Sequence, residues 1–239
     1  AGLEADHGGR WRGVKRGWVV LSGIILLGGT AGVIGYLAFW PGEKETPSQV
    51  KRLVVLPFEN LGVPEDEYFA NGTTDAITAR LASVSGLGVI SRQSAIQYKK
   101  STKPVRQIGE ELGVDYILEG TVQRERPGDP KSRVRVIPQL IRVADDTHMW
   151  ADTYDENMTE VFRVQSDIAE KVAMQLNVTL LEPERRAIKA KPTENPAAYE
   201  DYLRGMDHFW AMGSVTDAEQ AARLFQKAVS LDSRFAEAW

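Results

Sequence analysis

The chain has 239 residues, of which 43% are apolar and 26% are charged, and its formal net charge is −4. This balance is typical of folded protein in one or two domains, and the negative charge argues against a protein built to coat nucleic acid. The chain has no cysteine, which excludes disulfides, thiolate metal sites, iron–sulfur clusters and cysteine nucleophiles.

An uncharged stretch near the N-terminus predicts one transmembrane helix over residues 18–40. A helix of that length reaches roughly 34 Å, enough to cross a hydrocarbon core of about 30 Å. Aromatic side chains mark the two expected membrane interfaces: Trp18 at one end and Tyr36, Phe39 and Trp40 at the other. A signal peptide is the alternative, but its apolar region is usually only about 7–15 residues long.

The charges that flank this helix predict its orientation. Four basic residues precede it and outnumber the acidic ones: Arg10, Arg12, Lys15 and Arg16. The positive-inside rule therefore places residues 1–17 in the cytoplasm as a short basic stub. The span would lie in the inner membrane of a bacterium. The remainder of the chain, which follows a polar tether at residues 41–50, would lie in the periplasm.

Three glycines of the predicted span are spaced four and three residues apart: Gly28, Gly32 and Gly35. On a helix they share one face, and such a face lets another helix, a flat cofactor or a lipid approach closely. The alternative is that glycine is simply common in membrane helices. The first interpretation predicts a helix contact there.

Residues 51–181 are expected to form one α/β domain with a mixed sheet. The first half alternates strands with helices: strand 52–61, helix 64–84, strand 87–92 and helix 103–113. The spacing of Phe69, Ile77 and Leu81 predicts the buried face of the first helix. The helix expected at 103–113 has a proline at its start and a glycine, Gly113, at its end. Proline is favoured at the start of helices and glycine just past their end.

The second half of this domain is expected to begin with an antiparallel hairpin, strands 114–125 and 132–143. Pro138 in the second strand lacks a backbone donor, which predicts a sheet edge or a bulge at that point. One more strand at 149–157 and a long amphipathic helix at 159–181 complete the domain. Val164, Ile168 and Val172 are spaced to face inward on that helix.

The C-terminal part is expected to be helical. A charged connector at 182–195 is followed by two helices, 196–212 and 217–231. Ala221, Phe225 and Ala228 match the tetratricopeptide pattern, in which Ser233 replaces the usual proline. Residues 196–239 therefore predict one such repeat with the start of a second, and since a lone repeat cannot bury its faces, we expect the native protein to continue past Trp239.

Three stretches together resemble one family: "LVVLPFENLGVPEDEYFANGTTDAITARL" (53–81), "VRQIGEELGVDYILEGTVQR" (105–124) and "RVRVIPQLIRVADDTHMWADTYDENMTEVFRVQSDIA" (133–169). They look like the extracytoplasmic α/β domain of bacterial single-pass regulators, which is similar to the amino-terminal domain of TolB and to FlgO-like lipoproteins. The resemblance implies a cytoplasmic kinase, winged-helix or cyclase module, one span, this domain and then tetratricopeptide repeats. Residues 1–17 are too few for such a module, and Pro138 and Ser233 depart from the pattern.

No constellation of residues predicts catalysis, a cofactor or a metal. The three histidines lie in separate segments, and Asp145 beside His148 suits a polar strand end better than acid–base chemistry. Basic residues of the predicted hairpin form either a solvated face or a docking patch for an acidic partner or lipid headgroups: Arg124, Arg126, Lys131, Arg133 and Arg135. Tyr202 and Trp210 in the aromatic-rich helix 196–212 are further candidate docking residues.

Three functions are consistent with these patterns. The first is a non-enzymatic membrane protein whose periplasmic domain and repeats bind partner proteins, as the sensing or scaffold half of a transmembrane regulator. The second is an accessory subunit of a large photosynthetic or respiratory membrane complex, held by its span. The third is a hydrolytic enzyme that depends on Asp145 or His148. The partners expected are the membrane, integral membrane subunits and periplasmic proteins, without nucleic acid; a small ligand is left open.

Overall fold

The computed structural model describes residues 50–239 apart from residues 130 and 212. In this part of the chain no helix is both long and apolar enough to cross a membrane. The predicted span at 18–40, with its glycines, interface aromatics and flanking basic residues, lies outside the described residues.

A seven-stranded mixed sheet is the centre of the fold, with the strand order β3-β1-β4-β5-β6. β1 is parallel to β3 and β4, whereas β5 runs antiparallel to β4 and pairs on its other side with β6 and β7. The short strand β2 adds a second parallel pairing to β4. The strands are β1 (Lys51–Val55), β2 (Glu59–Asn60), β3 (Leu87–Val89), β4 (Tyr116–Arg124), β5 (Arg133–Arg142), β6 (Thr147–Ala151) and β7 (Tyr154–Asn157).

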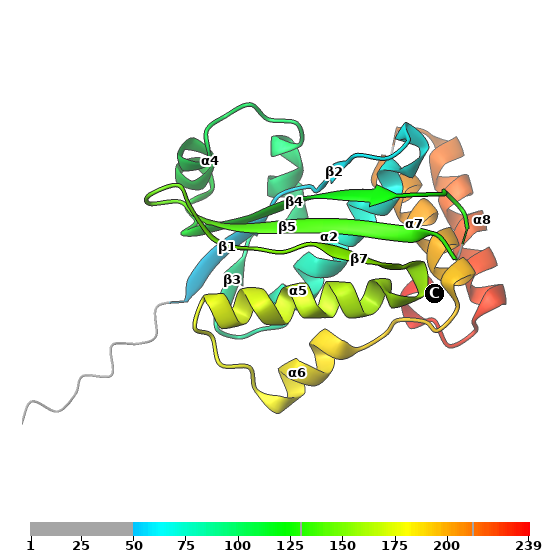
Figure 1. The fold of residues 1–239 in the computed structure, drawn as a ribbon. Helices are drawn as coiled ribbons and strands as arrows, with labels where there is room; N and C mark the ends of the chain where they lie inside the picture. The colour runs from blue at the N-terminus through cyan, green and yellow to red at the C-terminus, as the bar shows by residue number, and fades with distance from the viewer. Residues whose placement is uncertain (1–49, 130, 212) are drawn as a thin grey trace, which may run out of the picture. The chain divides into compact units, whose positions relative to one another are not determined.

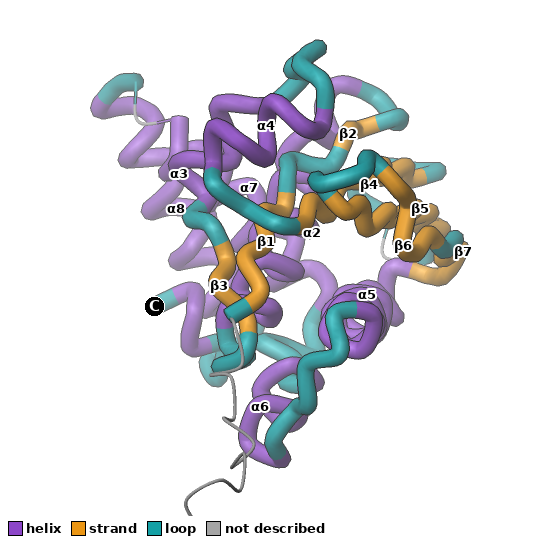
Figure 2. Tube along the Cα trace, turned by 90° about the vertical axis from the view of Figure 1, so that its left-hand side faces the viewer, coloured by secondary structure: helices purple, strands orange, loops and turns teal. Residues whose placement is uncertain are grey.

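Helices cover the sheet on both faces, with α5 and α6 on one side and α4 on the other (Figure 1). The larger core lies between the sheet, α2 and α5, and the smaller core lies under α3 and α4. Figure 2 shows the same layers from the side. The helices are α2 (Glu67–Ala82), α3 (Arg92–Ala95), α4 (Val105–Leu112), α5 (Val161–Gln175), α6 (Glu182–Lys189), α7 (Pro196–Ala211) and α8 (Val215–Leu231), and short 3-10 turns include Pro64–Asp66 and Ala236–Ala238.

The predicted helix faces are confirmed. On α2, the side chains of Phe69, Ile77 and Leu81 are fully or almost fully buried, and on α5 the same holds for Ile168 and Val172. Helix α4 ends at Gly113, whose backbone is left-handed with φ of 61°. Apolar periodicity and helix-end chemistry therefore determined these helices.

Two predictions for the second half of the sheet differ in part from the structure. The single strand expected at 149–157 is two strands, β6 and β7, separated at Asp152 and Thr153. Pro138 does not lie on an edge strand, because β5 pairs with strands on both sides. The expected irregularity lies close by: neither β6 nor β7 pairs with Pro138, and the β5–β6 register shifts between Leu140 and Ile141. The Pro138 carbonyl accepts the Asp152 N–H at 3.3 Å, so its nitrogen also faces the interruption between β6 and β7, where no ladder donor is needed.

The segment expected to be a charged connector contains helix α6. Ile188 on this helix is completely buried in the larger core. The Glu184 carboxylate accepts the backbone N–H groups of Ser85 and Leu181, each at 2.8 Å. The segment was expected to be a connector because half of its residues are charged and only Ile188 packs in the core. Helix α6 is part of the folded body that also contains α7 and α8.

Candidate partner-binding site at the helical hairpin

Helices α7 and α8 form a hairpin that packs on α2 of the α/β domain. Leu203 of α7 lies against Gly72 of α2, where a Cβ atom would come within 2.4 Å of the leucine side chain. Within the hairpin, a Cβ at Gly205 would lie 2.5 Å from the Phe225 ring. Both contacts depend on the absence of a side chain, so the helices meet at close range.

A buried group of polar side chains, here called the Arg124 cluster, joins the sheet to the hairpin; it comprises Arg124, Asp66, Tyr68 and Glu200. The Arg124 side chain is 1% exposed, and its guanidinium donates to Asp66 Oδ1 at 2.5 Å and Asp66 Oδ2 at 3.1 Å. It also donates to Glu200 Oε2 at 2.7 Å and to the Tyr68 hydroxyl oxygen at 2.7 Å. The Tyr68 hydroxyl in turn donates to Glu200. Buried charges are stable when they are paired in this way.

The surroundings shift the pKa values of Tyr68, Glu200 and Arg124. The directions keep the Glu200 carboxylate and the Arg124 guanidinium charged. Burial, and then the hydrogen bond to Glu200, raise the pKa of Tyr68 to about 12. Burial would raise the pKa of Glu200, but the hydrogen bonds from Arg124 and Tyr68 outweigh it and lower that pKa. Burial would lower the pKa of Arg124, whereas its hydrogen bonds to Glu200 and Asp66 reverse this and raise it. The cluster is therefore an ion network with a neutral tyrosine.

Exposed apolar side chains mark the end of the hairpin where α7 stops and α8 begins, here called the hairpin tip and defined by Phe209, Trp210 and Val215. Their exposed fractions are 41%, 42% and 78%. The two rings pack edge to face with centroids 5.3 Å apart, and the guanidinium of Arg92 lies 4.6 Å from the centre of the Trp210 ring. Arg92 is itself paired with Asp75 at 2.8 Å. The tip thus exposes aromatic surface that is fixed from beneath.

The candidate docking residues of the β4–β5 hairpin do not form one free basic face. Arg124 is buried in its cluster rather than solvated. Arg133 and Arg135 share one carboxylate, that of Asp155, at 2.9 Å and 2.8 Å. Arg126 lies 3.4 Å from Asp129, and Lys131 is exposed. Half or more of the expected positive surface is therefore neutralised within the domain.

The two aromatic candidates have different surroundings. Tyr202 is partly buried between the rings of Tyr199, Phe225 and Phe235, so it belongs to the hairpin's packing. Trp210 is part of the hairpin tip. Of the two, Trp210 is the one with an exposed side chain.

Sequence reasoning missed Asp66, Tyr68 and Glu200 as partners of Arg124. One signal was present in the strand itself, because Leu118, Val122 and Arg124 alternate and the first two face the larger core. An arginine in phase with core residues predicts a buried charge with partners. The identity of those partners depends on the packing of α7, which no local pattern gives.

The residues considered for acid–base chemistry lie at the surface. His148 is exposed on β6, and the Asp145 carboxylate accepts the Thr147 hydroxyl at 2.7 Å and pairs with Arg142 at 3.2 Å. These bonds hold the tight turn before β6, in which Asp146 has φ of 54°. Among the described residues, no three histidine, aspartate or glutamate side chains converge in a way that could hold a metal ion.

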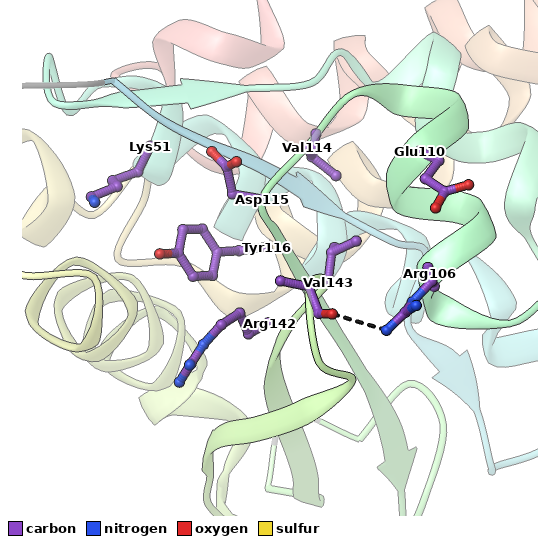
Figure 3. Close-up of a pocket in the computed structure, with 9 residues that line it drawn as sticks. Lys51, Arg106, Glu110, Val114, Asp115, Tyr116, Arg142 and Val143 are labelled. Carbon is purple, nitrogen blue, oxygen red and sulfur yellow. Dashed lines mark hydrogen bonds between the residues drawn. The ribbon is translucent and has the colours of Figure 1, made fainter.

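A hollow lies at the end of the sheet away from the Arg124 cluster, where β1 and β4 begin and β5 ends (Figure 3). Its volume is about 530 Å³. It is lined by Lys51, Arg106, Glu110, Val114, Asp115, Tyr116, Arg142, Val143 and Ala144. The Arg106 guanidinium donates to the carbonyl oxygen of Ala144 at 2.9 Å, which fixes α4 to the end of β5.

One curated relative is similar in sequence to most of this chain. It is "Putative adenylate cyclase 3" of Rhizobium meliloti, 35% identical over 189 residues. The match covers 78% of this chain but 31% of that protein. The chain thus spans about a third of its relative's length. No protein-family profile matches the chain.

Solved structures are similar to part of this chain, at low identity and with TM-scores of 0.40 or less. TolB from Acinetobacter baumannii is 14% identical with a TM-score of 0.40 over 54% of this chain and 28% of its own. A PelC dodecamer from Paraburkholderia phytofirmans is 16% identical with a TM-score of 0.39, over 54% of this chain and 89% of its own. The lipoprotein GNA1162 from Neisseria meningitidis is 14% identical with a TM-score of 0.37, over 51% of this chain and 96% of its own.

Proposed function

We propose that this chain is the partner-binding, non-catalytic part of a membrane-anchored bacterial regulator, and that it engages partner proteins through the hairpin tip. Two features of the hairpin support this most directly. The buried Arg124 cluster fixes the hairpin to the α/β domain, and the hairpin tip exposes Phe209 and Trp210. Exposed aromatic patches on an otherwise polar surface are common at protein interfaces, and tryptophan is enriched among the residues that dominate binding.

The junction also gives a partner at the hairpin a physical connection to the rest of the chain. Glu200 of α7 contacts Arg124 at the end of β4, and β4 is hydrogen-bonded to β1. β1 begins at Lys51, directly after the predicted tether at 41–50. Displacing α7 would break the Arg124 cluster at the end of β4. β4 lies next to β1, the strand that follows the predicted tether. This is the connection that a sensing domain needs.

The repeat pattern supports the same proposal. Phe225, one position of the expected tetratricopeptide pattern, packs against Gly205 of α7 in the hairpin. Such repeats supply docking surfaces for proteins. We further propose that the N-terminus is cytoplasmic, that residues 18–40 span the membrane and that the α/β domain is periplasmic. The support for these three features is the sequence.

The Rhizobium meliloti relative suggests what kind of regulator this is. Its name describes an adenylate cyclase, and this chain spans about a third of it. In the arrangement proposed here, the matched region senses or binds partners, and cyclase chemistry would belong to the portion of such a protein that this chain does not span.

The test is co-purification of the full chain from native membranes, with the recovered proteins quantified by mass spectrometry. The variant Phe209→Ser/Trp210→Ser removes the aromatic tip, and Met174→Ser is the matched control because Met174 is a 56% exposed apolar residue on α5. We expect a discrete partner to be depleted at least about tenfold by the tip variant and unchanged by the control. Equal recovery from both variants would contradict the proposal.

A further inference from the structure

The hollow at the start of β1 and β4 is built by the sheet register and by α4. Tyr116 lies directly opposite Arg142 in the β4–β5 pairing, and it pairs with Leu53 on β1, two residues after Lys51. These three strands therefore bring Lys51, Tyr116 and Arg142 to one end of the sheet. In Figure 3 the Tyr116 hydroxyl and the ends of Lys51 and Arg142 point to the same side.

The charges around the hollow are not balanced. Three cationic side chains line it, Lys51, Arg106 and Arg142, together with two carboxylates, Glu110 and Asp115. Among residues 50–239 as described, neither Lys51 nor Arg106 has a carboxylate within 4.0 Å. Asp115 accepts the backbone N–H of Arg52 at 3.1 Å, and Arg142 pairs with Asp145 only in an exposed contact of 3.2 Å. In the part of the chain that the structure describes, Lys51 therefore lines the hollow without an ion-pair partner.

We infer that this hollow, the Lys51–Tyr116–Arg142 pocket, binds the phosphate group of an anionic ligand. A guanidinium binds phosphate oxygens with two parallel hydrogen bonds, an ammonium adds a point charge, and a phenol hydroxyl donates a third bond. The volume of about 530 Å³ is within the range of small-molecule sites. Val114 and Val143 also line the hollow, and both are buried in the smaller core on its α4 side.

Two sources could present this chemistry: a free phosphorylated small molecule, or the headgroup of an anionic phospholipid. The second source follows from the position of Lys51, which begins the described domain about ten residues after the predicted span at 18–40. A tether of that length reaches at most about 36 Å, so the pocket would lie within reach of a membrane surface. The pocket is remote from the hairpin tip in sequence and in the fold, and its failure would leave the proposed function standing.

The experiment uses residues 49–239, a compact unit that leaves out the predicted span and so does not insert into vesicles through it. Two probes are used: inorganic pyrophosphate in calorimetry, and vesicles of phosphatidylcholine with about 30% phosphatidylglycerol in flotation. The pocket variant is Lys51→Gln/Arg142→Gln. Its control is Arg133→Gln/Arg135→Gln, which removes the same charge from two exposed arginines that pair with Asp155 instead. Tyr116→Phe, which removes one hydroxyl, is a milder third variant.

We expect at least one probe to bind the wild type. The affinity of that probe for the pocket variant should be lower by about tenfold or more, and its affinity for the control should be within about twofold of wild type. Tyr116→Phe should weaken the same probe by about threefold or more. Binding of pyrophosphate identifies a free phosphorylated ligand, and binding of vesicles alone identifies a lipid headgroup. The inference is overturned if neither probe binds, or if the pocket variant and the control bind equally well.

Discussion

Arg124 of β4 and Glu200 of α7 form an ion pair of 2.7 Å between residues that lie 76 positions apart in the chain, and the arginine side chain is 1% exposed. The pair connects the sheet to the helical hairpin. Asp66 and Tyr68, just before and at the start of α2, complete the arginine's hydrogen bonds. Removing Arg124 would leave Asp66, whose side chain is 2% exposed, without its ion-pair partner, which makes the junction sensitive to mutation at this residue.

Replacing Arg124 with leucine is expected to destabilise the protein by about 3–5 kcal/mol, because Asp66 would remain a buried carboxylate without a counterion. The measurement is the free energy of unfolding from urea denaturation. Arg163→Leu is the control, since Arg163 is 46% exposed and pairs only with surface carboxylates. That change should cost about 1 kcal/mol or less. Similar losses for the two variants would show that the Arg124 cluster does not hold the hairpin.

The lowered pKa of Glu200 predicts a dependence of stability on pH. Burial opposes its ionisation, but the hydrogen bonds from Arg124 and Tyr68 favour the carboxylate and lower the pKa below the ordinary 4.5. A group whose pKa is lower in the folded state stabilises the fold above its unfolded pKa, and this contribution is lost as pH falls through the folded pKa.

The stability difference between wild type and Glu200→Gln should therefore be largest near neutral pH and shrink as the pH falls below about 4.5. Urea denaturation at a series of pH values measures it. Glu219→Gln, a change at a 62% exposed residue of α8, should alter the unfolding free energy little. A difference between wild type and Glu200→Gln that stays constant down to acid pH would argue against the ion pair.

The contact between Gly205 and Phe225 predicts a non-additive pair of substitutions. Gly205→Ala gains helix propensity of about 1 kcal/mol but places a methyl group against the phenylalanine ring, so it should destabilise the wild type or leave it unchanged. In the Phe225→Leu background the same change should be stabilising. Gly213→Ala is the control, because its Cβ would make only ordinary contacts, the closest at 3.6 Å. A double-mutant cycle with no coupling would refute this packing.

Ile188 tests whether α6 is part of the folded body. It is completely buried, so Ile188→Ala should cost about 2–5 kcal/mol of unfolding free energy. Leu181→Ala, at a 57% exposed residue one position before the same helix, should cost far less. If both changes were equally mild, residues 182–189 would be the connector that their composition suggests.

Periodic segments of the chain could be predicted from sequence, and single decisive contacts could not. The helices at 67–82 and 161–175 have uninterrupted apolar spacing, and the turn between β4 and β5 has strong turn residues. Helix α6 was missed because one isoleucine and one capping glutamate hold it among charged residues. The Arg124 cluster was missed because its partners come from α2 and α7, which meet only in the tertiary fold.

The direct test of the central claim, that the hairpin tip binds a partner protein, is site-specific photo-crosslinking in cells. A photoreactive phenylalanine analogue is introduced at Trp210 or, as the control, at Met174, which is 56% exposed on α5. The account predicts an adduct with one discrete protein from position 210 and none from position 174. Absence of any adduct from position 210, or the same adducts from both positions, would contradict it.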